Sequence, residues 1–301
     1  MQPRATYPDH LRELVDEYLT TLWFAPGSGD VPMSLAGTEG LVEAMRYSLL
    51  AGGKRMRPVL AMATLESLGR DPEELLPTAA AIELVHTYSL VHDDLPAMDD
   101  DDLRRGIATC HVVYGEDVAI LAGDAMYAEG LRLVCEAQAG TPAQRLAIVL
   151  ELARATGVAG MVGGQYLDLR GHGHHSSESL DQVHALKTGR LIAASVHCAL
   201  AYAPPPEAVA ATYRQFAQEL GLLFQIVDDI LDVAGSEESL GKPVGADERM
   251  GKATYVSIHG LDRSRQLAEA CHRRTLDLLE QLPGPLDDLS ALVHLTHERQ
   301  H

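Results

Sequence analysis

The sequence predicts an all-α protein whose 301 residues form one helical domain. Hydrophobic residues make up 46% of the chain, and Ala and Leu dominate them while β-branched runs are short, which favours helix. No stretch shows the alternation of apolar and polar residues that is typical of a strand. No linker divides the chain, and this length is enough to bury a large core. We therefore predict a single helical bundle over residues 1–301.

Turn signals set the expected helices of the first half. Residues 25–37 are rich in Gly and Pro and predict a loop. Thr38 is expected to cap the next helix, and Gly52 to help end it. Pro58 is tolerable because it falls in a first helical turn. In order, we expect helices at residues 11–24, 38–50, 57–68, 72–95, 112–137 and 143–160.

The second half continues the helical pattern. A Gly/His/Ser loop over 171–179 precedes a helix at 180–203, which three consecutive prolines end. A long apolar helix at 207–233 leads into a polar loop at 234–251. Two shorter helices close the chain, with Pro283 between them.

Charge and cysteine usage exclude several classes of protein. The net charge of −19 argues against nucleic acid or an anionic membrane surface as partner. The four cysteines lack CxxC spacing and are expected to be reduced core thiols. No apolar run is expected to span a membrane, and residues 1–16 lack a signal-peptide core. A cytoplasmic protein is therefore expected.

Two aspartate clusters dominate the sequence, and each follows an apolar run that predicts a buried helix. Buried carboxylates need partners to stay ionised. Mg²⁺ is a suitable partner, because it binds one or two carboxylates together with phosphate oxygens of a substrate. The sequence therefore predicts a phosphorylated ligand between two acidic walls. The clusters read HDDLPAMDDDDLRRG from His92 and QIVDDILD from Gln225.

Spacing indicates which carboxylates converge. Asp228 and Asp232 are four residues apart and share one helix face, with Gln225 near the same stripe. Pro96 disrupts the first helix, so Asp93 and Asp99 are expected to converge across a bend. An EF-hand is excluded because neither cluster has its glycine and terminal glutamate. The His-Asp dipeptide also occurs in HD-type phosphohydrolases, but those enzymes need further histidines.

Several basic residues predict anion binding. Lys54 and Arg57 lie where a helix begins, and exposed N–H groups there attract anions. Arg104 and Arg105 follow the first cluster and either grip phosphate oxygens or form surface ion pairs. Gly189 interrupts a helix at a cost, which predicts a kink serving a site. Further candidates are His86, two helical turns before Asp93, and Lys187, Lys242 and Lys252.

The motifs resemble those of the short-chain trans-isoprenyl diphosphate synthases along nearly the whole chain, in order, and are most similar to those of bacterial farnesyl diphosphate synthases. Two DDxxD-type motifs with KTG between them are highly specific, and the first has the two extra residues of the bacterial form. The matching stretches are GGKRMRP from Gly52, HTYSLVHDDLPAMDDDDLRRG from His86, GGQYLDL from Gly163, KTG from Lys187, FQIVDDILD from Phe224, GKPVGAD from Gly241 and GKATY from Gly251.

The resemblance implies a magnesium-dependent prenyltransferase of isoprenoid biosynthesis that is a homodimer. Three Mg²⁺ ions would hold the diphosphate of an allylic substrate. By this resemblance Asp93, Asp99 and Asp228 are the principal ligands, and Asp94, Asp229 and Asp232 assist. Arg104, Lys187 and Lys252 match contacts to the allylic diphosphate, and Lys242 matches another basic contact nearby. The isopentenyl diphosphate site is matched by Lys54, Arg57, His86 and Arg105.

The implied reaction is ionisation, condensation and elimination. An allylic cation forms near Thr188 and Gln225, the double bond of isopentenyl diphosphate attacks it, and a proton is lost to the departed diphosphate. Residues 234–251 are expected to close the site against water.

By the same resemblance, product length depends on the residues four and five before the first aspartate, which are Ser89 and Tyr88 and would floor the pocket. Tyr88 is large enough to stop elongation at a C15 product, although an ordinary core position remains open for it. A geranylgeranyl or geranyl diphosphate synthase and a non-catalytic subunit of a partner synthase remain alternatives. A terpene cyclase is disfavoured, because its second motif is normally of the NSE type.

Overall fold

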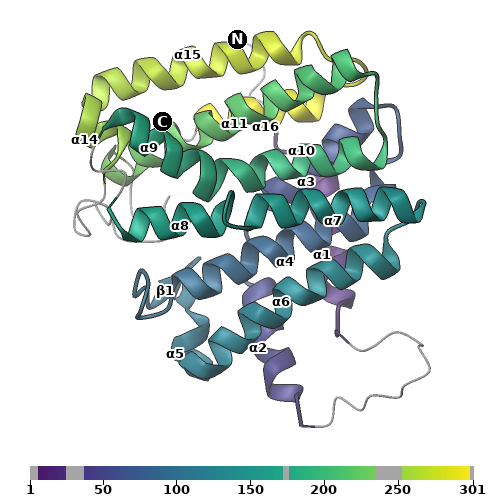
Figure 1. Ribbon diagram of the computed structural model, residues 1–301, viewed down its shortest axis with the longest axis vertical. Coiled ribbons are helices and arrows are strands. Elements are labelled where there is room, and N and C mark those ends of the chain that lie inside the picture. The colour runs from purple at the N-terminus through teal and green to yellow at the C-terminus, as the bar shows by residue number, and fades with distance from the viewer. Residues whose placement is uncertain (1–5, 25–36, 172–175, 235–252, 299–301) are drawn as a thin grey trace.

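The computed structural model describes residues 6–24, 37–171, 176–234 and 253–298, and these are almost entirely helical, as predicted (Figure 1). One hairpin departs from this pattern, because β1 (Leu103–Arg104) pairs antiparallel with β2 (Ile107–Ala108). The helices are α1 (Asp9–Thr21), α2 (Glu39–Leu49), α3 (Met56–Ser67), α4 (Leu76–Asp93), α5 (Cys110–Tyr114), α6 (Glu116–Ala137), α7 (Pro142–Thr156), α8 (Met161–Leu169), α9 (Ser177–His184), α10 (Arg190–Tyr202), α11 (Glu207–Ala234), α14 (Tyr255–His259), α15 (Leu261–Leu279) and α16 (Asp287–Glu298).

The helix boundaries differ from the sequence expectation at identifiable residues. Gly115 has a φ of 91° and divides the helix expected at 112–137 into α5 and α6. A short 3₁₀ turn, η1 (Pro72–Leu75), precedes α4, and a π-helical turn, η3 (Ala185–Gly189), separates α9 from α10. Helix α8 was not expected. Thr38 stands at the N-cap of α2 as predicted, but its side chain makes no capping hydrogen bond.

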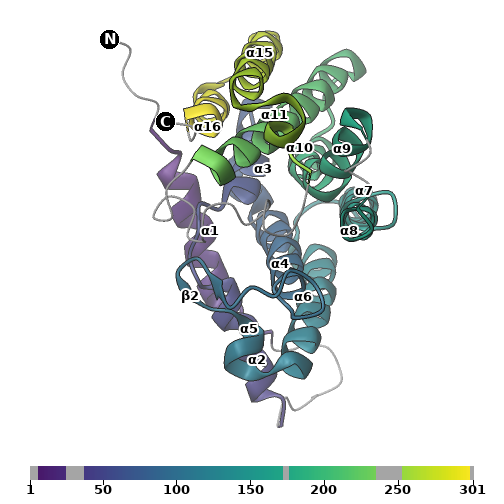
Figure 2. The ribbon, with the colours of Figure 1, turned by 90° about the vertical axis from the view of Figure 1, so that its left-hand side faces the viewer.

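The central helices are α3, α4, α10 and α11 (Figure 2). Helix α3 packs against both α4 and α10, and α10 packs against α11. The helices that carry the two aspartate clusters, α4 and α11, are therefore joined through α3 and α10.

Helix α4 is buried on nearly all sides, and this includes a charged residue. Glu83 is only 1% exposed, and its Oε1 accepts a hydrogen bond of 2.8 Å from Nη1 of Arg55. Arg55 also binds Asp16 through Nε at 2.8 Å. Breaking a buried ion pair by removing one partner costs about 3–5 kcal/mol, so Arg55 fixes the start of α3 against α4 and α1.

Two expectations about membranes and cysteines need correction. Among the described residues, one stretch, Pro142–Leu169, is long and apolar enough to cross a membrane. Length and composition alone are weak evidence for a span, and the stretch is divided into α7 and α8. The cysteines are free as expected, but Cys135 is exposed whereas the other three are buried.

Candidate active site

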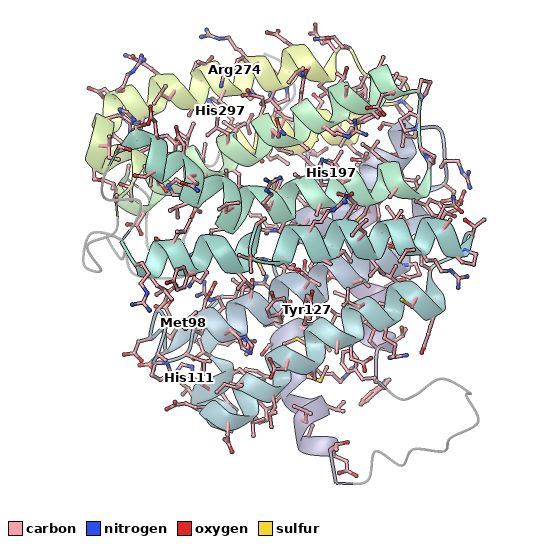
Figure 3. The ribbon with its side chains drawn as sticks, viewed as in Figure 1. Met98, His111, Tyr127, His197, Arg274 and His297 are labelled. Atoms are coloured by element: carbon pink, nitrogen blue, oxygen red, sulfur yellow. The ribbon has the colours of Figure 1, made fainter. Side chains whose placement is uncertain are left out.

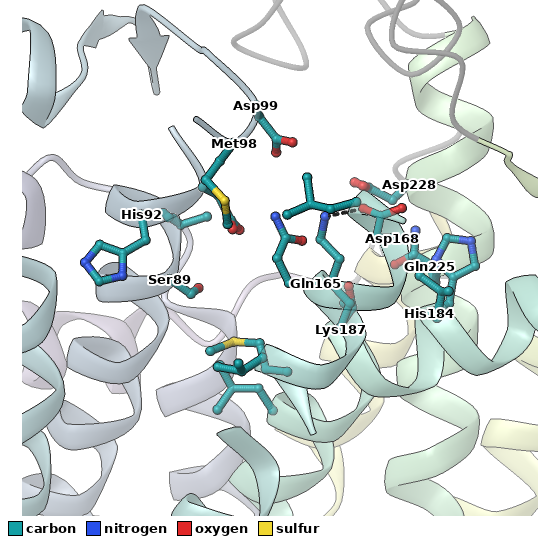
Figure 4. Close-up of a pocket in the computed structure, with 18 of the residues that line it drawn as sticks. Ser89, His92, Met98, Asp99, Gln165, Asp168, His184, Lys187, Gln225 and Asp228 are labelled. Atoms are coloured by element: carbon teal, nitrogen blue, oxygen red, sulfur yellow. Dashed lines mark hydrogen bonds and ion pairs between the residues drawn. The ribbon is translucent and has the colours of Figure 1, made fainter. Parts of the chain in front are cut away.

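A cavity of about 520 Å³ receives aspartates from both clusters. Asp93 ends α4, Asp99 lies in the loop that follows, and Asp228 lies near the end of α11; all three line this acidic cavity. In Figure 4, Asp99 and Asp228 lie at the same end of the cavity, on either side of it. Two acidic walls therefore face a common space, as the sequence predicts.

The bend after α4 results from the residues around Pro96. Since proline cannot continue a helix, the chain turns back on itself. The backbone N–H of Asp99 donates to the carbonyl oxygen of Asp93 at 2.9 Å, and that of Asp101 donates to Asp94 at 3.2 Å. Burial, more than the nearby Asp99 carboxylate, raises the pKa of Asp93 to about 6. The bend thus concentrates carboxylates where a cation would stabilise them.

The other three predicted metal ligands have protein contacts or lie deeper. Asp94 is almost fully buried and accepts from Nε of Arg104 at 2.9 Å. Asp229 accepts from Nε2 of Gln225 at 2.8 Å and from the backbone N–H of Tyr255 at 2.7 Å. Asp232 is 3% exposed and is not among the residues that line the cavity in the described part of the chain.

Lysine and threonine enter the cavity from the π-helical turn η3. Lys187 and Thr188 both line the cavity, and Nζ of Lys187 donates to Oδ2 of Asp168 at 2.7 Å (Figure 4). Burial lowers the pKa of Lys187, but the carboxylates of Asp168, Asp93 and Asp99 outweigh it, and the pKa is raised. Lys187 is therefore a cation at neutral pH. At KTG, where a kink was expected, the structure has a π-helical turn, which is a local expansion of a helix.

Two glycines let neighbouring helices approach this turn closely. A Cβ added to Gly164 of α8 would lie 2.2 Å from the backbone nitrogen of Lys187. A Cβ added to Gly221 of α11 would lie 3.2 Å from Cα of Gly189. The turn is thus held between the backbones of α8 and α11, and glycine at 164 is required by contact with backbone atoms.

Helix α8 contributes residues that sequence reasoning missed. Gln165 and Asp168, three apart on one face, both line the cavity. The amide nitrogen and oxygen of Gln165 are buried and have no hydrogen-bond partner among the described residues. His184 also lines the cavity, with Nε2 3.5 Å from Oδ2 of Asp229. The i,i+3 spacing of Gln and Asp within GGQYLDL was the signal that could have identified the α8 pair.

A second, cationic cavity of about 1030 Å³ adjoins the first. Lys54, Arg57, His86 and Arg105 line it, and Arg57 and His86 also line the acidic cavity. Nη1 of Arg57 lies 3.2 Å from Nε2 of His86. Burial, and then the charges of Arg57 and Arg105, lower the pKa of His86, so its imidazole is neutral. These residues were predicted to bind one substrate, and the structure brings them together.

The two predicted chain-length residues also line the acidic cavity. Tyr88 packs edge-on against Tyr127 with ring centroids 5.2 Å apart, and Oγ of Ser89 donates to the carbonyl oxygen of His86 at 2.8 Å. Figure 4 shows Ser89 farther into the cavity than Asp99. Tyr166 of α8 is an exposed residue in the lining of the same cavity.

Arg104 and Arg105 are neighbours in the sequence but line different cavities. Arg104 lines the acidic cavity and binds Asp94, so it forms an ion pair, but with a nearly buried carboxylate rather than at the surface. Arg105 lines the cationic cavity, and its Nη2 lies 3.7 Å from Oε1 of Glu83. Several positions that the sequence singled out lie outside the described residues. They are Lys242, Lys252, the histidines at 172, 174 and 175, and the expected lid at 234–251 apart from Ala234.

The donor set of the acidic cavity fits a hard divalent cation. Asp93, Asp99 and Asp228 offer carboxylate oxygens, which Mg²⁺ prefers, and the basic residues beside them suit a phosphorylated ligand. The arrangement of acidic and cationic cavities that meet at Arg57 and His86 provides room for two anionic substrates.

Comparison with known proteins agrees with this geometry. A farnesyl diphosphate synthase from Geobacillus stearothermophilus is 46% identical over 235 residues, which are 77% of this chain and 79% of that protein. A chloroplastic geranylgeranyl pyrophosphate synthase from Capsicum annuum is 45% identical over 241 residues, 79% of this chain and 65% of that protein.

Solved structures and a family model extend the comparison. A geranyltransferase from Helicobacter pylori, solved in complex with magnesium and isoprenyl diphosphate, superposes with a TM-score of 0.78 at 29% identity and covers 100% of this chain and 97% of its own. Residues 38–282 match the family model described as polyprenyl synthetase. The chain therefore belongs to the polyprenyl synthetase family of trans-prenyltransferases.

Proposed function

We propose that this chain is a farnesyl diphosphate synthase, which condenses isopentenyl diphosphate first with dimethylallyl and then with geranyl diphosphate. The observation that carries the proposal is an acidic cavity lined by Tyr88 that shares Arg57 and His86 with a cationic cavity. The similarity to the Geobacillus farnesyl diphosphate synthase supports the same product. We also propose that residues 1–301 act as a single polyprenyl synthetase domain.

The allylic diphosphate is proposed to bind in the acidic cavity with three Mg²⁺ ions. Asp93, Asp99 and Asp228 would hold the ions directly, while Asp94, Asp229 and Asp232 assist through neighbouring contacts or waters. When bound, the ions supply charge that stabilises the departing diphosphate. The carboxylate oxygens on both sides of this cavity support the assignment.

Cationic side chains are proposed to hold the diphosphate while its carbon–oxygen bond breaks. Lys187 and Arg104 reach the acidic cavity and remain charged, and Lys242 and Lys252 are added by resemblance alone. Thr188 and Gln225 line the same space, where the dipoles of their polar side chains would stabilise the allylic cation.

Isopentenyl diphosphate is proposed to bind in the cationic cavity through Lys54, Arg57, His86 and Arg105. A neutral His86 keeps one N–H donor for a diphosphate oxygen without adding charge beside Arg57. The C3–C4 double bond then attacks the allylic cation beside Thr188 and Gln225, a carbon–carbon bond forms, and a proton passes to the released diphosphate.

Product analysis tests the proposal. Purified protein with Mg²⁺, isopentenyl diphosphate and dimethylallyl, geranyl or farnesyl diphosphate in turn should give a C15 product from the first two and no turnover of the third. A C20 product would favour a geranylgeranyl synthase, the candidate supported by the Capsicum relative. Absence of turnover with all three would contradict an enzyme that acts alone.

A homodimer in the cytoplasm is part of the proposal. Exposed apolar side chains on α5 and α6 are suited to burial against a second copy. They are Val112, Val113, Ile120 and Leu121. Ile120→Glu should convert a dimer into a monomer in analytical ultracentrifugation, while Leu146→Glu, an exposed apolar position on α7, should not.

A further inference from the structure

A second group of metal-ligating side chains lies where α15 packs against α16, apart from both cavities. Helix α15 carries Glu269 and His272, and α16 carries His294 and His297. Each pair is spaced i,i+3, so its two side chains share one helix face. In helical bundles, the same Glu-x-x-His spacing on facing helices provides ligands for metal ions. Figure 3 shows His297 in the layer below α15.

The potential ligand atoms are already close together. One carboxylate oxygen of Glu269 and one ring nitrogen from each of His272 and His297 lie within 4.8 Å of one another. Nε2 of His297 is 3.2 Å from Oε2 of Glu269, close to the separation of about 3.3 Å between neighbouring ligands of a tetrahedral Zn²⁺ with Zn–N of about 2.0 Å. The rings of His294 and His272 meet edge to face with centroids 5.1 Å apart, but His294 is not part of this group of mutually close ligand atoms.

The contacts within the group leave one buried donor or acceptor unsatisfied. The rings of His272 and His297 are stacked with centroids 4.2 Å apart and an interplanar angle of 8°. Nε2 of His272 is buried and has no hydrogen-bond partner among the described residues. Burial and the two neighbouring imidazoles lower the pKa of His272 to about 4, so the ring is in its neutral form at pH 7. A neutral imidazole is the form that binds metal.

We propose that Glu269, His272 and His297 bind a divalent cation of the Zn²⁺ type between α15 and α16, with a water as the fourth donor. Two imidazoles and one carboxylate favour Zn²⁺ or a similar 3d ion over Mg²⁺, which prefers oxygen ligands. The stacked rings of His272 and His297 rotate about their side-chain torsions so that both nitrogens face the ion. A structural ion pair between Glu269 and His297 would not by itself satisfy the buried nitrogen of His272.

The proposed ion would attach the last described helix to the body of the protein. On another part of α16, Leu292, Leu295 and Thr296 line the cationic cavity. A metal bond to α15 therefore fixes a helix that forms one wall of that cavity, and binding to the folded state raises the stability by mass action. The site is independent of the proposed prenyl transfer, so either can fail without the other.

Binding is tested on the full chain, without an affinity tag, in excess Mg²⁺ to occupy the acidic cavity. Titration with Zn²⁺ by calorimetry should give a tight site, and Co²⁺ should give the visible absorption bands of tetrahedral coordination. Thermal unfolding should shift upward with Zn²⁺. His272→Gln and, on a more exposed side chain, Glu269→Gln should each weaken Zn²⁺ binding at least about tenfold, a loss that even outer-shell partners of metal sites can cause.

Matched variants locate the ion. His197→Gln alters a His–Glu pair with a 3.3 Å contact to Glu151 but no third ligand in the described part of the chain, and should leave Zn²⁺ affinity unchanged. His10→Gln, in the trio with Glu66 and Asp288, and His172→Gln/His174→Gln/His175→Gln should also bind normally. Loss of binding in one of these variants, with full binding in folded His272→Gln and Glu269→Gln, would overturn the proposal.

Discussion

Nζ of Lys187 lies 2.7 Å from Oδ2 of Asp168, and this ion pair joins the π-helical turn to α8 inside the acidic cavity. The contact constrains a long, flexible cation that is proposed to hold a diphosphate. Because Asp168 holds the ammonium group of Lys187 in place, it is a positioning residue for Lys187. Asp168 lies on α8, a helix that the sequence analysis did not expect.

Replacing Asp168 tests this role. Asp168→Asn should lower kcat/KM for geranyl diphosphate about 10- to 100-fold, because a hydrogen bond to a charged group contributes about 1.5–3 kcal/mol. Steady-state kinetics measure the loss. In a double-mutant cycle with Lys187→Met, the two effects should be strongly non-additive. Additive losses, or unchanged kinetics in Asp168→Asn, would show that the ion pair does not position Lys187.

Gln165 should exchange stability for activity. Gln165→Met removes a buried amide that lacks partners among the described residues, so the free energy of unfolding should rise by about 1–3 kcal/mol while kcat/KM falls. Chemical denaturation and initial rates measure the two effects.

The matched control is Gln138→Met. Oε1 of Gln138 accepts from Oγ1 of Thr78 at 2.6 Å and its Nε2 donates to the carbonyl oxygen of Glu74 at 2.8 Å. This satisfied amide is far from the catalytic lining, so the variant should lose stability by about 1–3 kcal/mol and keep its kcat. Destabilisation by both substitutions would mean that the Gln165 amide has partners in the free protein.

The close approach of α8 to the π-helical turn predicts that alanine has opposite effects on stability at two glycines. Gly164→Ala should destabilise the protein by about 1–3 kcal/mol or more, because its Cβ would overlap backbone atoms of Lys187 that cannot rotate away. Gly40→Ala, in an exposed helical position with nothing within 4 Å, should stabilise it by about 0.4–1 kcal/mol. Thermal unfolding compares them, and equal shifts would argue against tight packing at Gly164.

Tyr88 is expected to limit product length. Tyr88→Ala should shift the products from C15 toward C20 or longer, because it removes an aromatic ring from the cavity lining beside Tyr127. Chromatography of radiolabelled products measures the shift. Tyr47→Ala disrupts a comparable edge-on pair with Tyr114 outside the acidic cavity and should leave the product unchanged. A C15 product from both variants would remove Tyr88 as the determinant.

The bend after α4 and the shared helix face of aspartates one turn apart were predictable because they depend on local rules. Proline must bend the chain after α4, and residues one helical turn apart must share a face. Asp93 and Asp99 meet across that bend as expected, whereas the arrival of Asp228 at the same cavity was predicted from the need to partner buried carboxylates and from the family motifs. The grouping of Arg57 with His86 was predicted from the order of the family motifs, and no single spacing in the sequence predicts it.

Other features depended on contacts between distant segments and could not be predicted from spacing. Asp94 is bound by Arg104, ten residues later, only because the β1–β2 hairpin folds back toward α4. Asp232, one helical turn after Asp228, is buried and is not among the described residues that line the cavity. Helix α8 was missed because its two glycines disfavour helix locally, whereas close packing on η3 requires the glycine at 164.

The π-helical turn has a consequence for how this enzyme tolerates sequence change. A π turn holds one residue more than an α turn, so deleting a single residue within 185–189 would let α9 and α10 join as one regular helix. Backbone hydrogen bonding would become regular, and because the wide turn absorbs the extra residue, the helices on either side would keep their relative rotation. The buried face of α10 would therefore still pack, while the expansion that presents Lys187 and Thr188 to the acidic cavity would be lost, so an in-frame deletion here damages activity more than the fold.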